Sequence, residues 1–406
     1  MGEAQGILGG IRVLDFGQVL AAPTTTRLMA ELGAEIIKVE LAPTGDSSRL
    51  LPHLKNGRSG YFIQQNRGKR SVCVNHRDPR AIDLLKRMIP KVDVMVENYA
   101  PGVVDRMGLG WDVVHALNPK LVMASISAFG EVGELSQLPG FDYIAAAYAG
   151  VLDMIGEKDG APMFPMLGMG DVMTGVHAMA AVNAALFYRE RTGKGQRVTT
   201  SLLQAYFHCH EVNVQAFTAS EGAVRPRRNG SHHYAGAPLG IFPVGEGHLF
   251  VCVLQGQWAR LCQAMGRPDM IDDPKFANST ARLANAQEVI DVVTHYLTRF
   301  SNVMEAVEAL GEERVPVAPI LSVAEAVKHP HLIESRIAKE ITDPVFGAFT
   351  VPGMPLRFSE YPDDLPLQAE YLGQSNGPVL REMLGLADDD IRALEAEGVL
   401  VSKPDA

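Results

Sequence analysis

Short apolar runs rich in β-branched residues alternate with helical stretches between residues 11 and 126 of this chain. The runs predicted as strands are 11–16, 35–40, 71–75, 92–97 and 121–126, and the predicted helices are 24–32, 79–88 and 103–107. Strands separated by helices form βαβ units, which place their strands in one parallel sheet. Ligands of such sheets bind outside the carboxyl ends of the strands. The sequence therefore predicts an α/β fold with a binding site at that edge.

The loop after the first predicted strand lacks the glycine pattern of a dinucleotide site. Residues 16–23 are FGQVLAAP, which contain no G-x-G-x-x-G run. That run lets the backbone approach a pyrophosphate closely at the start of a helix. Its absence disfavours a nicotinamide-dependent dehydrogenase.

Length, charge and cysteine content limit the class of protein. A chain of 406 residues predicts two domains. The net charge of −10 disfavours nucleic acid and anionic membranes as partners, so small molecules are expected. The four cysteines match neither a CxxC pair nor a disulfide framework, and no secretory segment is recognisable. A cytoplasmic protein is therefore expected.

Changes in composition predict the domain boundaries. Residues 1–215 form the expected large Rossmann-like domain, and 216–236, rich in Gly, Arg, Asn and His, form a linker. A smaller α+β domain is expected at 237–328, with a strand at 249–254 and helices near 258–265, 284–298 and 303–310. Residues 329–406 then return to the large domain, first through an irregular stretch at 329–358 and finally with a helix at 388–397.

Asp171 is the strongest candidate for a catalytic residue. It follows Gly170 in a glycine-rich turn and begins the longest helical candidate, 171–191. Taken alone, this position favours a helix cap, in which the carboxylate accepts backbone N–H groups. The positive end of the helix is expected to keep that carboxylate ionised and able to act as a nucleophile. His177 lies on a different face of the helix and is expected to be a packed core residue.

Six short sequence segments support the interpretation of Asp171 as a nucleophile. In order along the chain they are 10–16, 32–40, 66–71, 96–102, 170–175 and 192–198. Together they resemble the class III CoA-transferases of the CaiB/BaiF type, which include formyl-CoA transferase and, as a relative, α-methylacyl-CoA racemase. The resemblance weakens through residues 315–319 towards the C-terminus. It implies an acyl-CoA:carboxylate CoA-transferase with Asp171 as its nucleophile, acting through an aspartyl mixed anhydride and an aspartyl-CoA thioester. It also implies CoA as a substrate, no tightly bound cofactor, and two interlocked chains in a homodimer.

The resemblance also implies where CoA binds. The expected contacts are Val19, Leu20, Ala21, Asn75, His76, Arg77, Asn98, Tyr99, Ala100 and Arg106. Arg77 and Arg106 are the expected phosphate partners, since CoA carries several negative charges, and Tyr99 is expected beside the adenine. Lys69 and Arg70 either face phosphate or lie at the surface where a strand starts. The histidines lack the spacing of a metal site, so no metal is assigned.

Two departures from the family bear on the substrate. The racemase needs a His for proton transfer where this chain has Phe141, which disfavours racemisation. Asp142 and Gly170 are expected to support the site. Formyl-CoA transferase has a Gln at the position of Leu20 and a run of four glycines where this chain has 236–240, which contain Pro238. These changes predict a larger or less polar acyl group. A racemase and a catalytically silent CoA-binding protein remain the alternatives.

Overall fold

The computed structural model describes residues 6–361, 365 and 367–403. It divides into two compact units. The first takes in the chain up to Ala149, Met166–His210 and the chain from Pro330 onwards, and the second takes in Gly150–Pro165 and Glu211–His329. This division differs from the expected one. Residues 150–165 and 211–215, expected in the large domain, belong to the second unit, and residues 216–236, expected as a linker, cluster with that unit too.

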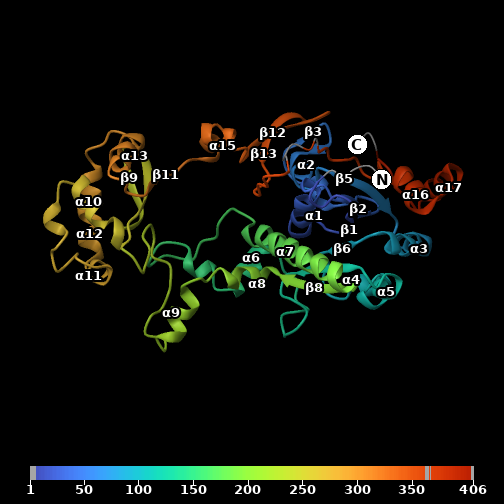
Figure 1. Cartoon of the computed structure of the whole chain (residues 1–406), viewed down its shortest axis with the longest axis horizontal. Coiled ribbons are helices and arrows are strands. Elements are labelled where there is room, and N and C mark those ends of the chain that lie inside the picture. Colours follow the sequence, from blue (N-terminus) through green and yellow to red (C-terminus); the bar gives the residue numbers. More distant parts are fainter. Residues whose placement is uncertain (1–5, 362–364, 366, 404–406) are drawn as a thin grey trace. The chain divides into compact units, whose positions relative to one another are not determined.

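A parallel sheet of six strands forms the centre of the first unit (Figure 1). Its strands are β1 (Arg12–Asp15), β2 (Glu35–Leu41), β5 (Lys69–Val74), β6 (Val94–Glu97), β7 (Val122–Ser127) and β8 (Gln196–Ser201). Their order is β5-β2-β1-β6-β7-β8, with every neighbouring pair parallel. This is the strand order of the Rossmann fold. The predicted parallel α/β sheet is confirmed.

Helices of the first unit alternate with these strands. They are α1 (Ala21–Glu31), α2 (Gly60–Asn66), α3 (Pro79–Met88), α4 (Val103–Arg106), α5 (Trp111–Leu117), α6 (Asp142–Tyr148), α7 (Met169–Thr192), α8 (Leu202–His208), α15 (Pro330–Glu334), α16 (Asn376–Leu384) and α17 (Asp388–Ala396). Gly193, in the left-handed conformation, ends α7 as its C-cap. The predicted helix at 171–191 therefore exists and begins two residues earlier.

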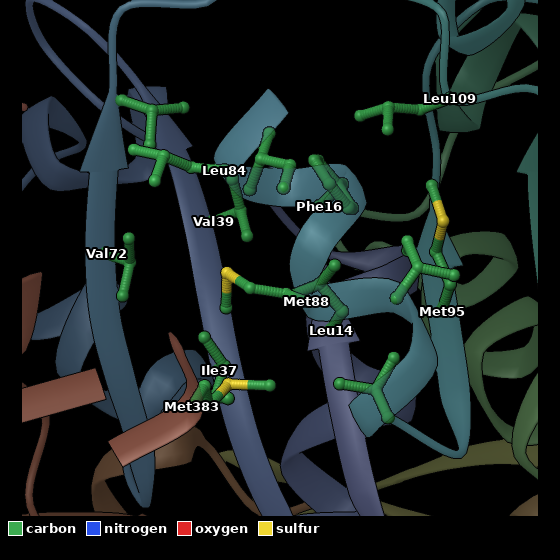
Figure 2. Packing of buried hydrophobic residues seen from close by; sticks show 14 of the residues in the cluster. Leu14, Phe16, Ile37, Val39, Val72, Leu84, Met88, Met95, Leu109 and Met383 are labelled. Atoms are coloured by element: carbon green, nitrogen blue, oxygen red, sulfur yellow. The ribbon is translucent and has the colours of Figure 1, made fainter. Parts of the chain in front are cut away.

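One hydrophobic cluster joins the sheet to a layer of helices. Figure 2 shows Leu14, Ile37 and Val72 from three neighbouring strands, packed with Leu84 and Met88 of α3. The cluster draws its other helical residues from α4, α5, α16 and α17. Burial of this apolar surface provides the main free energy that holds the layers together.

The C-terminal segment runs along the outer strand β5. The Val401 amide donates to the Cys73 carbonyl at 3.1 Å, and the Asn75 amide donates to the Val399 carbonyl at 2.8 Å. The stretch 329–358, expected to be irregular, contains a hairpin of β12 (Ala338–Asp343) and β13 (Gly347–Pro352). A buried ion pair of 2.7 Å between Arg58 and Asp343 ties this hairpin to the short ribbon β3 (Leu54–Lys55) and β4 (Arg58–Ser59).

The second unit has its own core. Its antiparallel sheet has the order β11 (Val317–Pro319), β10 (Gly247–Cys252), β9 (Leu239–Val244). The helices are α9 (Asn213–Ala219), α10 (Trp258–Ala264), α11 (Ser279–Ala284), α12 (Ala286–Leu297), α13 (Val303–Glu312) and α14 (Val323–Ala326). Side chains of α10, α12 and α13 pack with the sheet around buried Trp258. Within the described part of the chain, no helix has the length and apolar character that a membrane span requires.

Candidate active site

The cavity of interest lies where the strand order of the parallel sheet reverses. From β1 the chain proceeds through β2 and β5 towards one edge, and from β6 through β7 and β8 towards the other. Loops after adjacent strands diverge at such a point and leave a crevice at the carboxyl ends. Here the crevice is a cavity of about 360 Å³. Its lining consists of Gln18–Ala21, Asn98–Pro101, Ile126–Phe129, Ser136, Leu138–Phe141, Asp171 and Leu202.

Asp171 lies in the first turn of α7 and lines this cavity. It is not the helix cap that the sequence predicts. The N-cap is Gly168, which has no side chain that could cap the helix. The prediction placed the cap three residues too late because a glycine-rich turn gives no side-chain indication of where the helix begins.

Asp142, the first residue of α6, performs the capping from outside the helix. Its Oδ1 accepts a hydrogen bond from the Asp171 amide at 2.9 Å, and its Oδ2 accepts one from the Tyr206 hydroxyl at 2.9 Å. Gly170 is required between these groups, since a Cβ there would overlap both the Tyr206 ring and the Asp142 carboxylate. The arrangement holds the backbone of Asp171 and leaves its carboxylate for the cavity.

Burial raises the pKa of Asp171, and the neighbouring charge of Asp142 raises it further, to about 7. The sequence predicted the opposite, an acid kept ionised by the helix end. That prediction was wrong because desolvation and a like charge outweigh the helix terminus at this position. Burial also raises the pKa of Asp142 itself, against hydrogen bonds from Tyr206 and from the α7 backbone.

The loop after β1 is bound to the loop after β6. The Gln18 amide donates to Asn98 Oδ1 at 2.8 Å, and Asn98 Nδ2 donates to the Gln18 carbonyl at 2.9 Å. Gln18 Nε2 donates to the Tyr99 hydroxyl at 3.3 Å. Burial raises the pKa of Tyr99 to about 12, so its hydroxyl stays protonated. The cavity therefore gathers seven predicted site residues: Val19, Leu20, Ala21, Asn98, Tyr99, Ala100 and Asp171.

The other four predicted CoA contacts lie apart from this cavity. Asn75, His76 and Arg77 follow β5, the outermost strand, at the same carboxyl edge of the sheet. Arg106 ends α4, and both Arg77 and Arg106 are exposed. None of the four is part of the cavity lining.

Lys69 does not have the surroundings that the sequence suggested, whereas Arg70 is partly exposed near the start of β5, as one of the two alternatives expected. Lys69 is buried and forms an ion pair of 3.0 Å with Asp15, so it faces neither phosphate nor solvent. Arg70 pairs with Glu35 and Glu382. The positive charge of each side chain is thus paired with carboxylates of the protein itself.

The comparisons with known proteins agree with this geometry. Residues 8–376 match the sequence profile described as CoA-transferase family III. The chain belongs to CoA-transferase family III. This family III protein is 34% identical to formyl-CoA:oxalate CoA-transferase of Streptomyces avermitilis, over 97% of this chain and 99% of the relative. It is 32% identical to succinyl-CoA:glutarate CoA-transferase of Mus musculus, over 97% and 90%. A CAIB/BAIF family protein from Brucella suis has a similar structure, with a TM-score of 0.80 and 28% identity over 93% of this chain and all of that one. The protein is a CoA-transferase.

Two tyrosines of this CoA-transferase lie near Asp171, and sequence reasoning missed both. Tyr206 supports Asp142, as described above. Tyr61, on α2, has its pKa raised by burial and then by the charges of Asp171 and Asp46. Its phenol therefore stays protonated within electrostatic reach of Asp171. Neither residue could be found by spacing, because each lies far from Asp171 in the sequence.

Phe141 and the histidines are the residues that bear on racemase chemistry and on metal binding. Phe141 lines the cavity and is 79% exposed, and its ring has no proton to transfer. His177 is exposed, with its ring 5.6 Å from that of His208, so the expectation of a core residue was wrong. In residues 6–361, 365 and 367–403, no group of His, Cys, Asp and Glu is arranged to hold a metal ion.

Proposed function

We propose that the protein transfers CoA from an acyl-CoA thioester to a free carboxylate, with Asp171 as the nucleophile. The observation that carries this proposal is the position of Asp171. Its carboxylate lines the cavity at the point where the strand order reverses, while Asp142 holds its backbone amide. A carboxylate with a pKa of about 7 is ionised in a large fraction of molecules at neutral pH.

The proposed reaction exchanges one acyl–sulfur bond for another in four attacks. The Asp171 carboxylate attacks the thioester carbonyl and expels CoA thiolate, which leaves a mixed anhydride. The thiolate then attacks the Asp171 carbonyl, expels the donor carboxylate and forms an aspartyl-CoA thioester. An acceptor carboxylate attacks this thioester, expels CoA thiolate and forms a second mixed anhydride with Asp171. The thiolate then attacks the acceptor carbonyl of that anhydride and expels the Asp171 carboxylate, which gives the new acyl-CoA. These last steps restore Asp171 and divide a difficult exchange into easier ones.

The start of α1 is the proposed source of oxyanion donors. Its N-cap, Leu20, forms no side-chain cap, and the amides of Ala21 and Ala22 have no acceptor among the described residues. Ala21 lines the same cavity as Asp171. Unpaired amides at the positive end of a helix stabilise negative charge as it develops on a tetrahedral intermediate.

The cavity favours an acyl group without a second carboxylate. No Lys or Arg is found among its lining residues, all of which lie in the described part of the chain. Most of the lining is apolar, with Leu20, Ile126, Phe129 and Phe141 among its larger side chains. A second buried carboxylate without a cation would carry a large desolvation penalty. We therefore propose an apolar monocarboxylic acyl group, in contrast to the oxalate and glutarate in the names of the relatives.

The nucleotide end of CoA is proposed to extend along the carboxyl edge of the sheet towards Asn75, His76 and Arg77, with Arg106 as a second cation. Exposed guanidinium groups suit phosphate, because they donate two parallel hydrogen bonds. Both arginines are exposed: Arg77 lies just after β5, and Arg106 ends α4.

Trapping of the acyl intermediates tests the proposed function. The protein is incubated with a panel of acyl-CoA donors, treated with hydroxylamine, and digested for mass spectrometry. We expect a hydroxamate at Asp171 with apolar donors, and kcat/KM at least tenfold higher for these than for succinyl-CoA or oxalyl-CoA. Absence of any modification at Asp171 across the panel would contradict the mechanism. A preference for the dicarboxylic donors would contradict only the assignment of the acyl group.

We also propose that two chains associate as an interlocked homodimer. The supporting observation is a set of exposed apolar side chains on α6, α7 and α8: Tyr148, Val172, Val176, Phe187, Tyr188 and Phe207. Phe187 alone is 66% exposed. An apolar face of this kind marks a protein–protein contact. Light scattering during size-exclusion chromatography should give twice the chain mass, and Phe187→Asp should lower it; a monomeric wild-type protein would refute the proposal.

A further inference from the structure

Val19 has a backbone conformation that a β-branched residue rarely adopts. Its φ is +61°, in the left-handed region that glycine and asparagine favour. Such strain persists only where the surroundings impose it. Val19 lines the cavity together with Asp171 and directly precedes Leu20, the N-cap of α1. The strain therefore lies at the point where the chain turns from the sheet into the helix that faces the nucleophile.

A buried ion pair holds the backbone on both sides of this turn. Lys38 Nζ, on β2, donates to the Gly17 carbonyl at 2.6 Å, and the Val19 amide donates to Asp46 Oδ1 at 3.2 Å. Lys38 and Asp46 in turn form an ion pair of 2.9 Å, with each side chain only 1% exposed. One partner thus fixes the carbonyl before Gln18 and the other fixes the amide after it.

Further contacts keep this pair charged and in place. Burial acts to raise the pKa of Asp46, but the charge and hydrogen bond of Lys38, with the Ser48 amide, lower it to about 2. Burial acts to lower the pKa of Lys38, but Asp46, Asp15 and Glu40 raise it above its ordinary value. Both side chains are therefore ionised throughout the neutral range.

We infer that Lys38 and Asp46 are positioning residues, which hold Val19 in its left-handed conformation so that the start of α1 faces Asp171. This inference rests on the proposed function. The packing of α1 against α7 agrees with it, because Gly175 leaves no room for a Cβ beside the Ala21 carbonyl. A small rotation at Val19 would move the unpaired amides of Ala21 and Ala22 away from the thioester. An error of this size in the position of a catalytic donor is sufficient to reduce the rate strongly.

A purely structural role for the pair makes a different prediction. In that case its loss lowers stability and activity regardless of the residue at position 19. If the pair acts through Val19, glycine at that position removes the resistance to positive φ, so the loop needs the pair less. Coupling between the two sites is what a double-mutant cycle measures.

The test is a cycle between Lys38→Met/Asp46→Leu and Val19→Gly in the full chain. The double substitution removes both charges and so leaves no unpaired buried ion. We expect it to lower kcat/KM at least tenfold through kcat, with little change in KM. Adding Val19→Gly to this variant should then raise kcat/KM by at least about fivefold, whereas Val19→Gly in the wild-type background should not raise kcat/KM. If Val19→Gly changes kcat/KM by the same factor in both backgrounds, the inference is wrong.

Three controls keep the outcome decisive. Asp343→Asn breaks a buried ion pair of the same unit that does not contact the loop, so it should lower the Tm without coupling to Val19→Gly. Where Lys38→Met/Asp46→Leu does not fold, Asp46→Leu alone takes its place in the cycle, because it removes the acceptor of the Val19 amide while Lys38 keeps the charges of Asp15 and Glu40 nearby. Hydroxylamine trapping at Asp171 in the wild type separates the two ideas. Trapping without coupling overturns only the role of Lys38 and Asp46, whereas no trapping overturns the proposed function and this inference with it.

Discussion

Two helices begin at the same cavity, and their starts are built differently. The first residues of both α1 and α7 lie after N-caps, Leu20 and Gly168, that offer no side-chain cap. In α7 the missing cap is replaced by the Asp142 carboxylate, which accepts the Asp171 amide. In α1 no described residue replaces it, so the amides of Ala21 and Ala22 remain without acceptors.

The different starts of α7 and α1 suit two different chemical roles. A helix start that already binds a carboxylate has fewer free donors and holds its own backbone rigidly, which suits the residue that makes a covalent bond. A helix start with free donors can respond to charge that develops on the substrate. The glycines reinforce this division, since Gly170 admits the Asp142 clamp and Gly175 admits the close approach of α1.

The largest effect is expected from Asp171, the proposed nucleophile, on the α7 side. Asp171→Asn should lower kcat/KM for CoA transfer by roughly 10³-fold or more, because an amide cannot form the acyl intermediates. A matched control is Asp112→Asn, which changes an exposed acid in the first turn of α5. If Asp171→Asn exchanges CoA at nearly the wild-type rate, Asp171 is not the nucleophile, and the proposed difference in role between α7 and α1 is wrong.

The contact between the two helices should be the next most sensitive point. A Cβ added in Gly175→Ala would lie 2.6 Å from the Ala21 carbonyl oxygen and 2.8 Å from Thr24 Cβ. We expect the free energy of unfolding to fall by about 1–3 kcal/mol in urea titrations. Gly311→Ala, in α13, meets no atom within 4 Å and should not lower stability. Equal behaviour of the two variants would show that the α1–α7 approach is looser than described.

The clamp on α7 should control the pH dependence. With an Asp171 pKa of about 7, kcat/KM of the wild type should fall as pH drops below 7, since the protonated acid is a poor nucleophile. Asp142→Asn keeps a hydrogen-bond acceptor but removes the like charge, so the fall should move to lower pH. Burial, the larger cause, remains in the variant, and the pKa should therefore stay above that of a free Asp. An unmoved or upward-shifted profile would exclude Asp142 as a source of the raised pKa.

The pH dependence of stability offers a further test of the Asp171 environment. The pKa of Asp171 is raised from 3.8 in the unfolded chain to about 7 in the folded protein, so the folded state binds more protons between these values. Stability should then fall as pH rises from about 4 to 7. Asp171→Asn carries no such charge, and its gain in Tm over the wild type should be larger at pH 8 than at pH 5. Scanning calorimetry at both pH values measures this; an equal gain at both would argue against the raised pKa.

Much of the fold was accessible from the sequence, but the site was accessible only in part. The periodic runs predicted the strands of the parallel sheet and the helix that carries Asp171. Seven predicted site residues line one cavity: six follow β1 or β6, whose carboxyl ends share an edge, and Asp171 lies in the first turn of α7. Asn75, His76 and Arg77 follow the outer strand β5 and Arg106 ends α4, and their role stays a prediction.

The sequence by itself determined the parallel sheet, the edge at which the candidate site lies, and the placement of an acidic residue after a glycine turn. Local patterns suffice for these features because they depend on neighbours along the chain. Only the tertiary structure decided that Asp142 caps α7, that Lys69 is buried, and that Lys38 and Asp46 hold Val19. Each of these depends on groups from separate elements that meet in a low-dielectric interior, where desolvation and a single neighbouring charge set the protonation of Asp171.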